Sequence, residues 1–201
     1  MGTLKLNTTS GGSLSIQAAD GASDNTLTLP AVTGGNIVTT ADSGTITQGM
    51  LDSSATNTPI FSAYMSSVTT GSDNTATKVQ FDTENIDTDG AFDTSLYRFT
   101  VPSGKDGKYQ VNASVRISSG ANSNLATSFV YLYKNGSAVN ISYHNFSTSY
   151  PRDIHHDLSV ILDLSSGDYL EIYAAGNNVN NADFTVTSGS YSHFSAHKLI
   201  G

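Results

Sequence analysis

Strict alternation between apolar and polar side chains is the feature that most constrains how this 201-residue chain can fold. The clearest instance is residues 109–117, where Tyr, Val, Ala, Val and Ile occupy every second position. Successive side chains of a strand point to opposite faces, so this pattern predicts a strand with one buried face. Because the chain shows no helical periodicity, we expect an all-β protein.

Turn residues divide residues 58–201 into further short strands. Residues 129–133 run into Lys-Asn-Gly at 134–136, which predicts a hairpin because Asn-Gly accepts positive φ at both turn positions. A Ser-Gly-Asp turn interrupts two more strands within residues 158–173, and residues 191–200 form the last predicted strand. Many short strands joined by regular turns predict a jelly-roll β-sandwich.

Composition excludes several classes of function. The chain has no Cys, so it can form neither a disulfide framework nor a thiolate zinc site. Its formal net charge of −8 argues against binding nucleic acid or an anionic membrane surface. No segment approaches the ~20 apolar residues of a membrane-spanning helix, and the first residues do not resemble a signal peptide. We therefore expect no nucleic-acid partner, no membrane insertion and no export by a signal of its own.

Residues 1–57 differ in composition and in apolar pattern from the rest of the chain. Short apolar alternations recur between glycine-containing turns, and no aromatic residue precedes Phe61; the alternating positions are Leu4/Leu6, Leu14/Ile16, Leu27/Leu29, Ile37/Val38 and Ile46. So thin an apolar stripe cannot build a core alone. It favours an extended β-rich segment that identical chains share, while a flexible Ser/Thr/Gly linker stays open as the alternative. We predict two parts: an N-terminal segment at 1–57 and a jelly-roll head at 58–201.

The spacing of Phe81, Asp87, Phe92, Phe99 and the Gly-Lys-Tyr triplet at 107–109 resembles the signature of the complement component 1q-like globular head, whose fold is shared with tumour necrosis factor. Further segments match in the family's order, at residues 131–136, 162–168 and 192–196. Departures include two extra residues before Gly107 and Ala196 where the family has Gly. The resemblance implies a jelly-roll head that assembles as a homotrimer and binds a partner without catalysing a reaction.

Residues 1–57 carry a second resemblance. The segments 11–16, 26–30, 37–40 and 43–51 look like the amino-terminal segments of bacteriophage tail-fibre proteins. This implies a virion structural protein, assembled in the host cytoplasm as a short homotrimeric tail fibre. Residues 1–57 would contact other virion proteins, and the head would bind a receptor on the host surface. A glycan is the favoured receptor, and a protein is the alternative. A capsid decoration protein is the first alternative and a secreted recognition module the second.

Receptor contacts are expected in three loops rich in Asn, Ser and Tyr, namely 119–124, 140–151 and 176–183. Such residues combine adaptable hydrogen bonding with aromatic contact area, as binding loops do elsewhere. The candidate receptor-binding residues are Asn122, Asn124, Tyr143, Asn145, Tyr150, Asn177, Asn178 and Asn181.

The sequence also contains residue types that build catalytic and metal-binding sites elsewhere. The carboxylates between residues 82 and 93 are expected to lie scattered around a surface loop, so we predict no catalytic residues. The segment 85–90 resembles the start of a calcium loop, but Leu96 stands where an EF-hand has Glu. No cofactor is predicted, with a looser calcium site left open. His155 and His156 would point to opposite faces of a strand and cannot share one ion. His193 and His197 would share a face, and a histidine on a trimer axis could hold an ion. Because histidines bonded locally are much more common, no metal site is predicted.

Overall fold

The computed structural model describes residues 3–7, 13–17 and 57–199. Strands β1 (Thr3–Asn7) and β2 (Ser13–Gln17) pair antiparallel, with Leu4 opposite Ile16 and Leu6 opposite Leu14. The apolar alternations at residues 4–6 and 14–16 thus correspond to paired strands. The alternations at residues 27–29, 37–38 and 46 lie outside the described residues, and the boundary near residue 57 stays a prediction.

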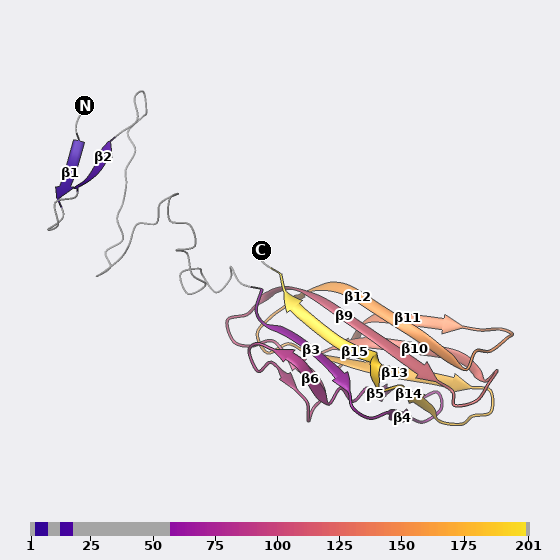
Figure 1. Ribbon diagram of the computed structural model, residues 1–201. Helices are drawn as coiled ribbons and strands as arrows, with labels where there is room; N and C mark the ends of the chain where they lie inside the picture. Colours follow the sequence, from indigo (N-terminus) through magenta and orange to yellow (C-terminus); the bar gives the residue numbers. More distant parts are fainter. Residues whose placement is uncertain (1–2, 8–12, 18–56, 200–201) are drawn as a thin grey trace. The chain divides into compact units, whose positions relative to one another are not determined.

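Residues 57–199 fold into two antiparallel sheets packed face to face (Figure 1). The seven-stranded sheet has the order β4-β14-β9-β15-β3-β6, and β12 pairs along the other edge of β9. Its strands are β3 (Ile60–Met65), β4 (Thr69–Gly71), β6 (Thr83–Asp87), β9 (Gly107–Ser118), β12 (Asp153–Leu164), β14 (Phe184–Val186) and β15 (Gly189–Lys198).

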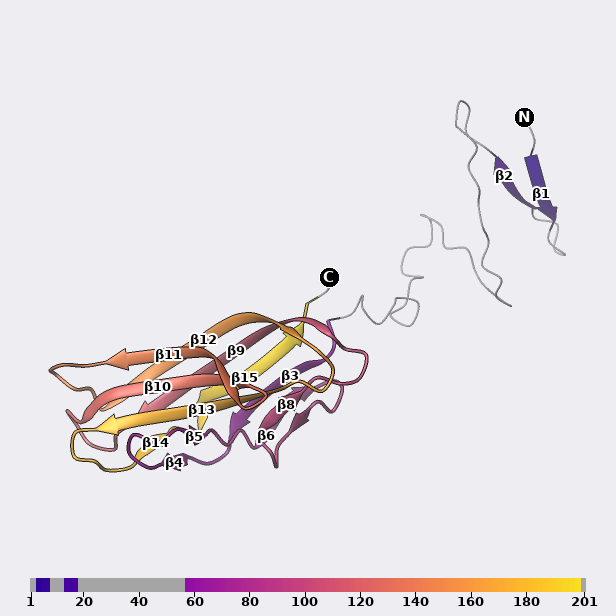
Figure 2. The same cartoon turned by 180° about the vertical axis from the view of Figure 1, so that it is seen from behind.

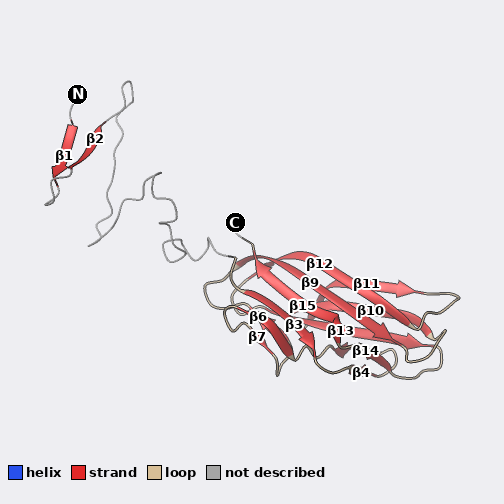
Figure 3. Cartoon of the chain, in the orientation of Figure 1, coloured by secondary structure: helices blue, strands red, loops and turns tan. Residues whose placement is uncertain are grey.

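The six-stranded sheet lies behind the first in Figure 1 and in front in Figure 2. Its order is β11-β10-β13-β8-β7, and β5 also pairs with β13. Its strands are β5 (Thr77–Lys78), β7 (Phe92–Asp93), β8 (Arg98–Thr100), β10 (Leu125–Lys134), β11 (Ser137–Asn145) and β13 (Tyr169–Asn178). The described residues are all strand, turn or loop (Figure 3), which confirms the all-β prediction. Within them, no helix could cross a membrane.

The core between the sheets is built largely from aromatic rings. The ring of Phe61 lies 4.9 Å from that of Phe92 and 4.8 Å from those of Phe99 and Phe194, measured between centroids. Offset and edge-on aromatic pairs at such distances add stability beyond the area they bury. The phenylalanines of the 81–99 signature are therefore core residues, and the alternating apolar side chains of β9 are also buried, none more than 3% exposed.

Asp87 of the signature acts through its carboxylate. Its Oδ1 accepts the backbone N–H groups of Asp89 at 3.2 Å and Ala91 at 3.0 Å, and its Oδ2 accepts that of Phe92 at 2.8 Å. These three bonds hold the turn that returns the chain from β6 to β7 and so place Phe92 in the core. A carboxylate is suited to this position because it accepts several hydrogen bonds without donating any.

The predicted hairpin at residues 134–136 is confirmed. Asn135 and Gly136 have φ values of 52° and 78°, which is the geometry of a two-residue turn with positive φ at both positions. The Oδ1 atom of Asn135 also accepts the backbone N–H of Tyr169 at 2.9 Å, so the turn is tied to the start of β13.

The head has two distinct ends. The start of β3 and the end of β15 lie together at one end, where the N–H of Lys198 donates to the carbonyl of Pro59 at 3.1 Å (Figures 1 and 2). The loops after β9, β11 and β13 lie at the other end, joined by backbone bonds from Leu125 to Pro151 and from Val179 to Asn124. The head is thus joined to the preceding chain at the end opposite these three loops.

Candidate recognition surface

The outer face of the six-stranded sheet is built from the alternation of β10. Ser128, Val130 and Leu132 are buried between the sheets. The side chains between them therefore point outward and are half-buried; they are Thr127, Phe129, Tyr131 and Tyr133. Three aromatic rings on one face of one strand are unusual for a surface, because aromatic residues are commonly placed in the core.

Cross-strand pairing extends these rings into a continuous row. Phe129 pairs with Tyr143 of β11, and Tyr131 pairs with Tyr173 of β13. The centroid distances along the row are 4.4 Å for Tyr143–Phe129, 5.6 Å for Phe129–Tyr131, 6.1 Å for Tyr131–Tyr133 and 4.4 Å for Tyr133–Tyr173. We call these five side chains the aromatic ladder. Burial raises the pKa of Tyr131 and of Tyr173 above the ordinary value for a phenol.

The two ends of the aromatic ladder differ. At one end, the Nζ atom of Lys78 lies 5.9 Å from the ring centroid of Tyr173. At the other end, Tyr143 stacks on Phe129 with its inner face and is 48% exposed. Among the described residues, no second ring or cation covers Tyr143. The open face of this ring is therefore available to a ligand.

Next to Tyr143, towards the loop end, lies a row of polar side chains. Thr127 pairs with Asn145 on one side and with Asn177 on the other, so the three residues form one line across β11, β10 and β13. Asn145 is exposed, and the other two are half-buried. We call this line the amide row. Carboxamides both donate and accept hydrogen bonds, so the amide row offers paired groups beside an open aromatic ring.

A cluster of charges supports the far end of the aromatic ladder. The side chain of Glu171 is only 5% exposed, and its Oε1 lies 2.6 Å from Lys78 Nζ and 3.3 Å from Arg98 Nε. The guanidinium of Arg98 also lies 4.4 Å from the ring centroid of Tyr169. A buried carboxylate requires such partners, so this cluster is part of the scaffold.

The sequence-predicted residues fall into three groups. Tyr143, Asn145 and Asn177 lie together on the surface just described. The predictions that 140–151 and 176–183 are loops were wrong at their starts, because residues 140–145 belong to β11 and residues 176–178 belong to β13. Alternating side chains with Val139, Ile141 and Tyr143 on one face extend the strand to Asn145.

Asn124 and Asn178 are buried, at 5% and 0% exposure. Asn124 exchanges hydrogen bonds with Asn180, donating through Nδ2 to Oδ1 at 2.9 Å and accepting the N–H of Asn180 at 3.2 Å. The Nδ2 atom of Asn178 donates to the carbonyls of Ala182 at 2.8 Å and Asp183 at 3.2 Å. Both side chains hold the loops in place, so we leave them out of the proposed contact surface.

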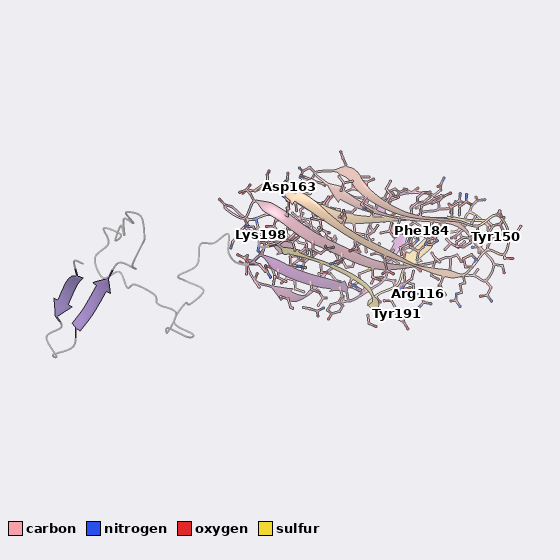
Figure 4. The ribbon with its side chains drawn as sticks, turned by 90° about the horizontal axis from the view of Figure 1, so that it is seen from above. Arg116, Tyr150, Asp163, Phe184, Tyr191 and Lys198 are labelled. Atoms are coloured by element: carbon pink, nitrogen blue, oxygen red, sulfur yellow. The ribbon has the colours of Figure 1, made fainter. Side chains whose placement is uncertain are left out.

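Asn122, Tyr150 and Asn181 lie in the loops at the same end. Asn122 and Asn181 are exposed, and Asn181 has a φ of 55°. Tyr150 is half-buried, and Figure 4 shows it at the end of the head opposite Asp163 and Lys198. These three residues lie in loops, outside the paired strands that carry Tyr143 and the amide row.

Sequence reasoning missed most of the aromatic ladder. Residues 129–133 were interpreted only as a strand, although aromatic residues at every second position predict an aromatic stripe on one face. The contribution of Tyr173 had no such signal, because it depends on the pairing of β13 with β10.

The predicted opposition of His155 and His156 is confirmed, since His155 is exposed and His156 is 1% exposed. In the suggested calcium segment, both carboxylate oxygens of Asp87 accept backbone N–H groups. Across residues 3–7, 13–17 and 57–199, no group of three or more His, Asp or Glu side chains is arranged to hold a metal ion.

No protein-family model matches the chain, and no curated protein matches it. Solved structures that resemble it include murine APRIL at pH 5.0, with a TM-score of 0.51 and 10% identity over 70% of this chain and 98% of that one. Murine APRIL at pH 8.0 gives the same TM-score and coverage with 12% identity. The globular domain of zebrafish complement 1qA gives a TM-score of 0.46 and 14% identity over 70% of this chain and 97% of that one. At such identities the likeness concerns the fold alone, and it confirms the predicted jelly-roll fold of the head.

Proposed function

We propose that this chain is a non-enzymatic recognition protein that binds a glycan through Tyr143 and the amide row. The observation that carries the proposal is the open ring of Tyr143 beside Asn145, Thr127 and Asn177. An aromatic ring provides contact area for the apolar face of a sugar, while amide and hydroxyl groups bond its hydroxyls. These groups act by stacking and hydrogen bonding, so the surface is suited to binding.

The rigidity of the surface supports this proposal. Tyr143 is fixed by stacking on Phe129, and the amide row stands on three paired strands. Groups that are already held in place lose little conformational entropy when a ligand binds. A weak single site also gains from repetition, and the complement component 1q-like signature supports a homotrimer with three such sites acting together.

For the biological setting, we propose a bacteriophage short tail fibre that is assembled in the host cytoplasm and incorporated into the virion. The tail-fibre-like pattern of residues 1–57 supports this role, as does the start of β3, which lies at the end of the head away from the amide row (Figure 1). Residues 1–57 would contact other virion proteins, and the head would contact the host surface.

Binding to bacterial surface polysaccharides tests the glycan proposal. The full chain would be titrated against a panel of purified lipopolysaccharides and capsular polysaccharides, and the best ligand would then be tested with Tyr143→Ala and Asn145→Ala. We expect Tyr143→Ala to weaken binding about tenfold or more, since it removes the stacking ring. Ile161→Ala is the control, because Ile161 is 56% exposed on β12 of the other sheet. Equal binding by wild type and Tyr143→Ala would refute the proposed surface.

Electron microscopy tests the setting separately. Gold-labelled antibody against residues 58–201 should mark the tail of purified virions. Label spread over the capsid would instead indicate the decoration protein, and unlabelled particles would remove the virion role while leaving the glycan proposal standing. Sedimentation equilibrium of the full chain at micromolar concentration tests the homotrimer, and a monomer at that concentration would contradict it.

A further inference from the structure

Two irregularities of the seven-stranded sheet meet at one point on its outer face. The pairing of β15 with β3 passes from Gly189–Met65 directly to His193–Tyr64, so residues 190–192 are extra on β15. The pairing of β6 with β3 passes from Ile86–Ser62 to Glu84–Ala63, so Asn85 is extra on β6. Bulges of this kind redirect side chains and often lie next to binding sites.

The two bulges flank a hollow of about 400 Å³, lined by Tyr64, Asn85, Gly189, Ser190 and His193. Each bulge supplies a lining residue that a regular strand would have pointed elsewhere, namely Ser190 from β15 and Asn85 from β6. Tyr64 stands between them on β3. The hollow therefore results from both bulges together.

The bulge of β15 is held in a defined shape. Gly189 has a φ of 71°, a conformation that side chains other than glycine rarely adopt. Ser192 is fully buried, and its Oγ accepts the backbone N–H of Arg116 at 3.2 Å. Above it, the guanidinium of Arg116 lies 4.7 Å from the ring centroid of Tyr191 (Figure 4), and the Nε2 of His155 donates to the carbonyl of Tyr191 at 3.0 Å. These contacts fix the wall of the hollow.

The lining consists of a phenol, a carboxamide, a hydroxyl and an imidazole, which together donate and accept hydrogen bonds. It contains two rings and no Asp, Glu, Lys or Arg. A charged ligand would find no counter-ion there, whereas a neutral ligand with several hydroxyls would find partners for them. The volume lies near the lower end of the range for small-molecule sites.

We infer that this hollow is a second binding site, which takes a neutral polyhydroxylated ligand the size of a mono- or disaccharide. The site lies on the sheet opposite the aromatic ladder and shares no residue with the surface of Tyr143. It is therefore independent of the proposed function and would stand if that proposal failed.

Saturation-transfer NMR on the full chain tests this inference with methyl α-glucoside, methyl β-galactoside and N-acetylglucosamine as probes. Asn85→Ala and His193→Ala change exposed residues, so both variants should keep the melting temperature of the wild type. We expect at least one probe to bind the wild type and to bind each variant about threefold to tenfold more weakly, as expected for a lost hydrogen bond.

Tyr143→Ala shows which of the two sites a probe occupies. Ile161→Ala is the control that should bind the probe as the wild type does, because Ile161 is 56% exposed on β12 and lines neither site. The inference is overturned if none of the three probes binds. It is also overturned if Asn85→Ala and His193→Ala bind as the wild type does, or if only Tyr143→Ala loses binding.

Discussion

Acidification should destabilise the head through the buried imidazole of His156. This side chain lies on the inner face of β12, with Nε2 2.8 Å from Ser128 Oγ and Nδ1 3.0 Å from Ser142 Oγ. A neutral imidazole carries one donor and one acceptor, and serine hydroxyls can match either, so the neutral form is fully bonded. The pKa of His156 is lowered to about 4, mainly by burial. The nearby His144 and His155 also lower this pKa, whereas Asp157 raises it by a smaller amount.

The pH dependence of stability follows from the difference between the pKa of His156 in the folded chain and in the unfolded chain. In the unfolded chain the pKa of His156 is about 6.5, so the unfolded state takes up a proton before the folded state does. Stability is therefore lost as the pH falls below about 6.5, and the loss from this group levels off below about 4. The interval between the two pKa values corresponds to about 3 kcal/mol of unfolding free energy.

Urea unfolding between pH 8 and pH 4 measures this loss. His156→Gln retains hydrogen-bonding capacity without a titrating group, whereas His155→Gln changes the exposed neighbour on the same strand. The free energy of unfolding of the wild type and of His155→Gln should fall by about 3 kcal/mol more than that of His156→Gln over this range. Carboxylates contribute equally to all three proteins and cancel in the comparison. Parallel curves for wild type and His156→Gln would refute the reasoning.

Two stability predictions concern residues of the fold. Gly71→Ala should lower the free energy of unfolding by about 1–3 kcal/mol, because the new Cβ would lie 2.3 Å from Cζ of the buried Phe184. Thr70→Ala on the same strand is the control. Wild-type stability of Gly71→Ala in urea would contradict the clash. Asp87→Ala should lower the free energy of unfolding by about 2–3 kcal/mol, because three backbone N–H groups lose their acceptor. Asp183 is exposed, so Asp183→Ala should leave the free energy of unfolding unchanged in the same assay. A loss as small for Asp87→Ala as for Asp183→Ala would contradict the role of the carboxylate.

Much of the fold could be predicted from local sequence. The alternation of residues 109–117 depends only on which face is buried, and the Asn-Gly turn at 135–136 depends only on backbone conformation. Both are local properties, and both are confirmed. The spacing of the 81–99 phenylalanines also has a local cause in part, since Asp87 holds the turn that brings Phe92 under the sheet.

The environment of His156 shows where local prediction stops. Alternation correctly placed His155 and His156 on opposite faces of one strand. Whether the inward imidazole meets apolar groups or hydroxyls depends on Ser128 and Ser142, which come from two other strands. Those contacts are set by the packing of one sheet on the other, and nothing near residue 156 in the sequence indicates them.

The candidate site was predicted from the composition of the loops. Composition cannot distinguish asparagines that contact a ligand from asparagines that hold a loop in place. Asn177 and Asn178 are neighbours with the same side chain, yet Asn177 stands in the amide row and Asn178 is fully buried beneath the loop. The difference arises because β13 points successive side chains to opposite faces, and the pairing of Thr127 with Asn177 determines which one faces outward. The register of the pairing, rather than the identity of the residue, therefore selects the contact surface. Tyr143 follows the same rule, since only its pairing with Phe129 makes it the open end of the aromatic ladder.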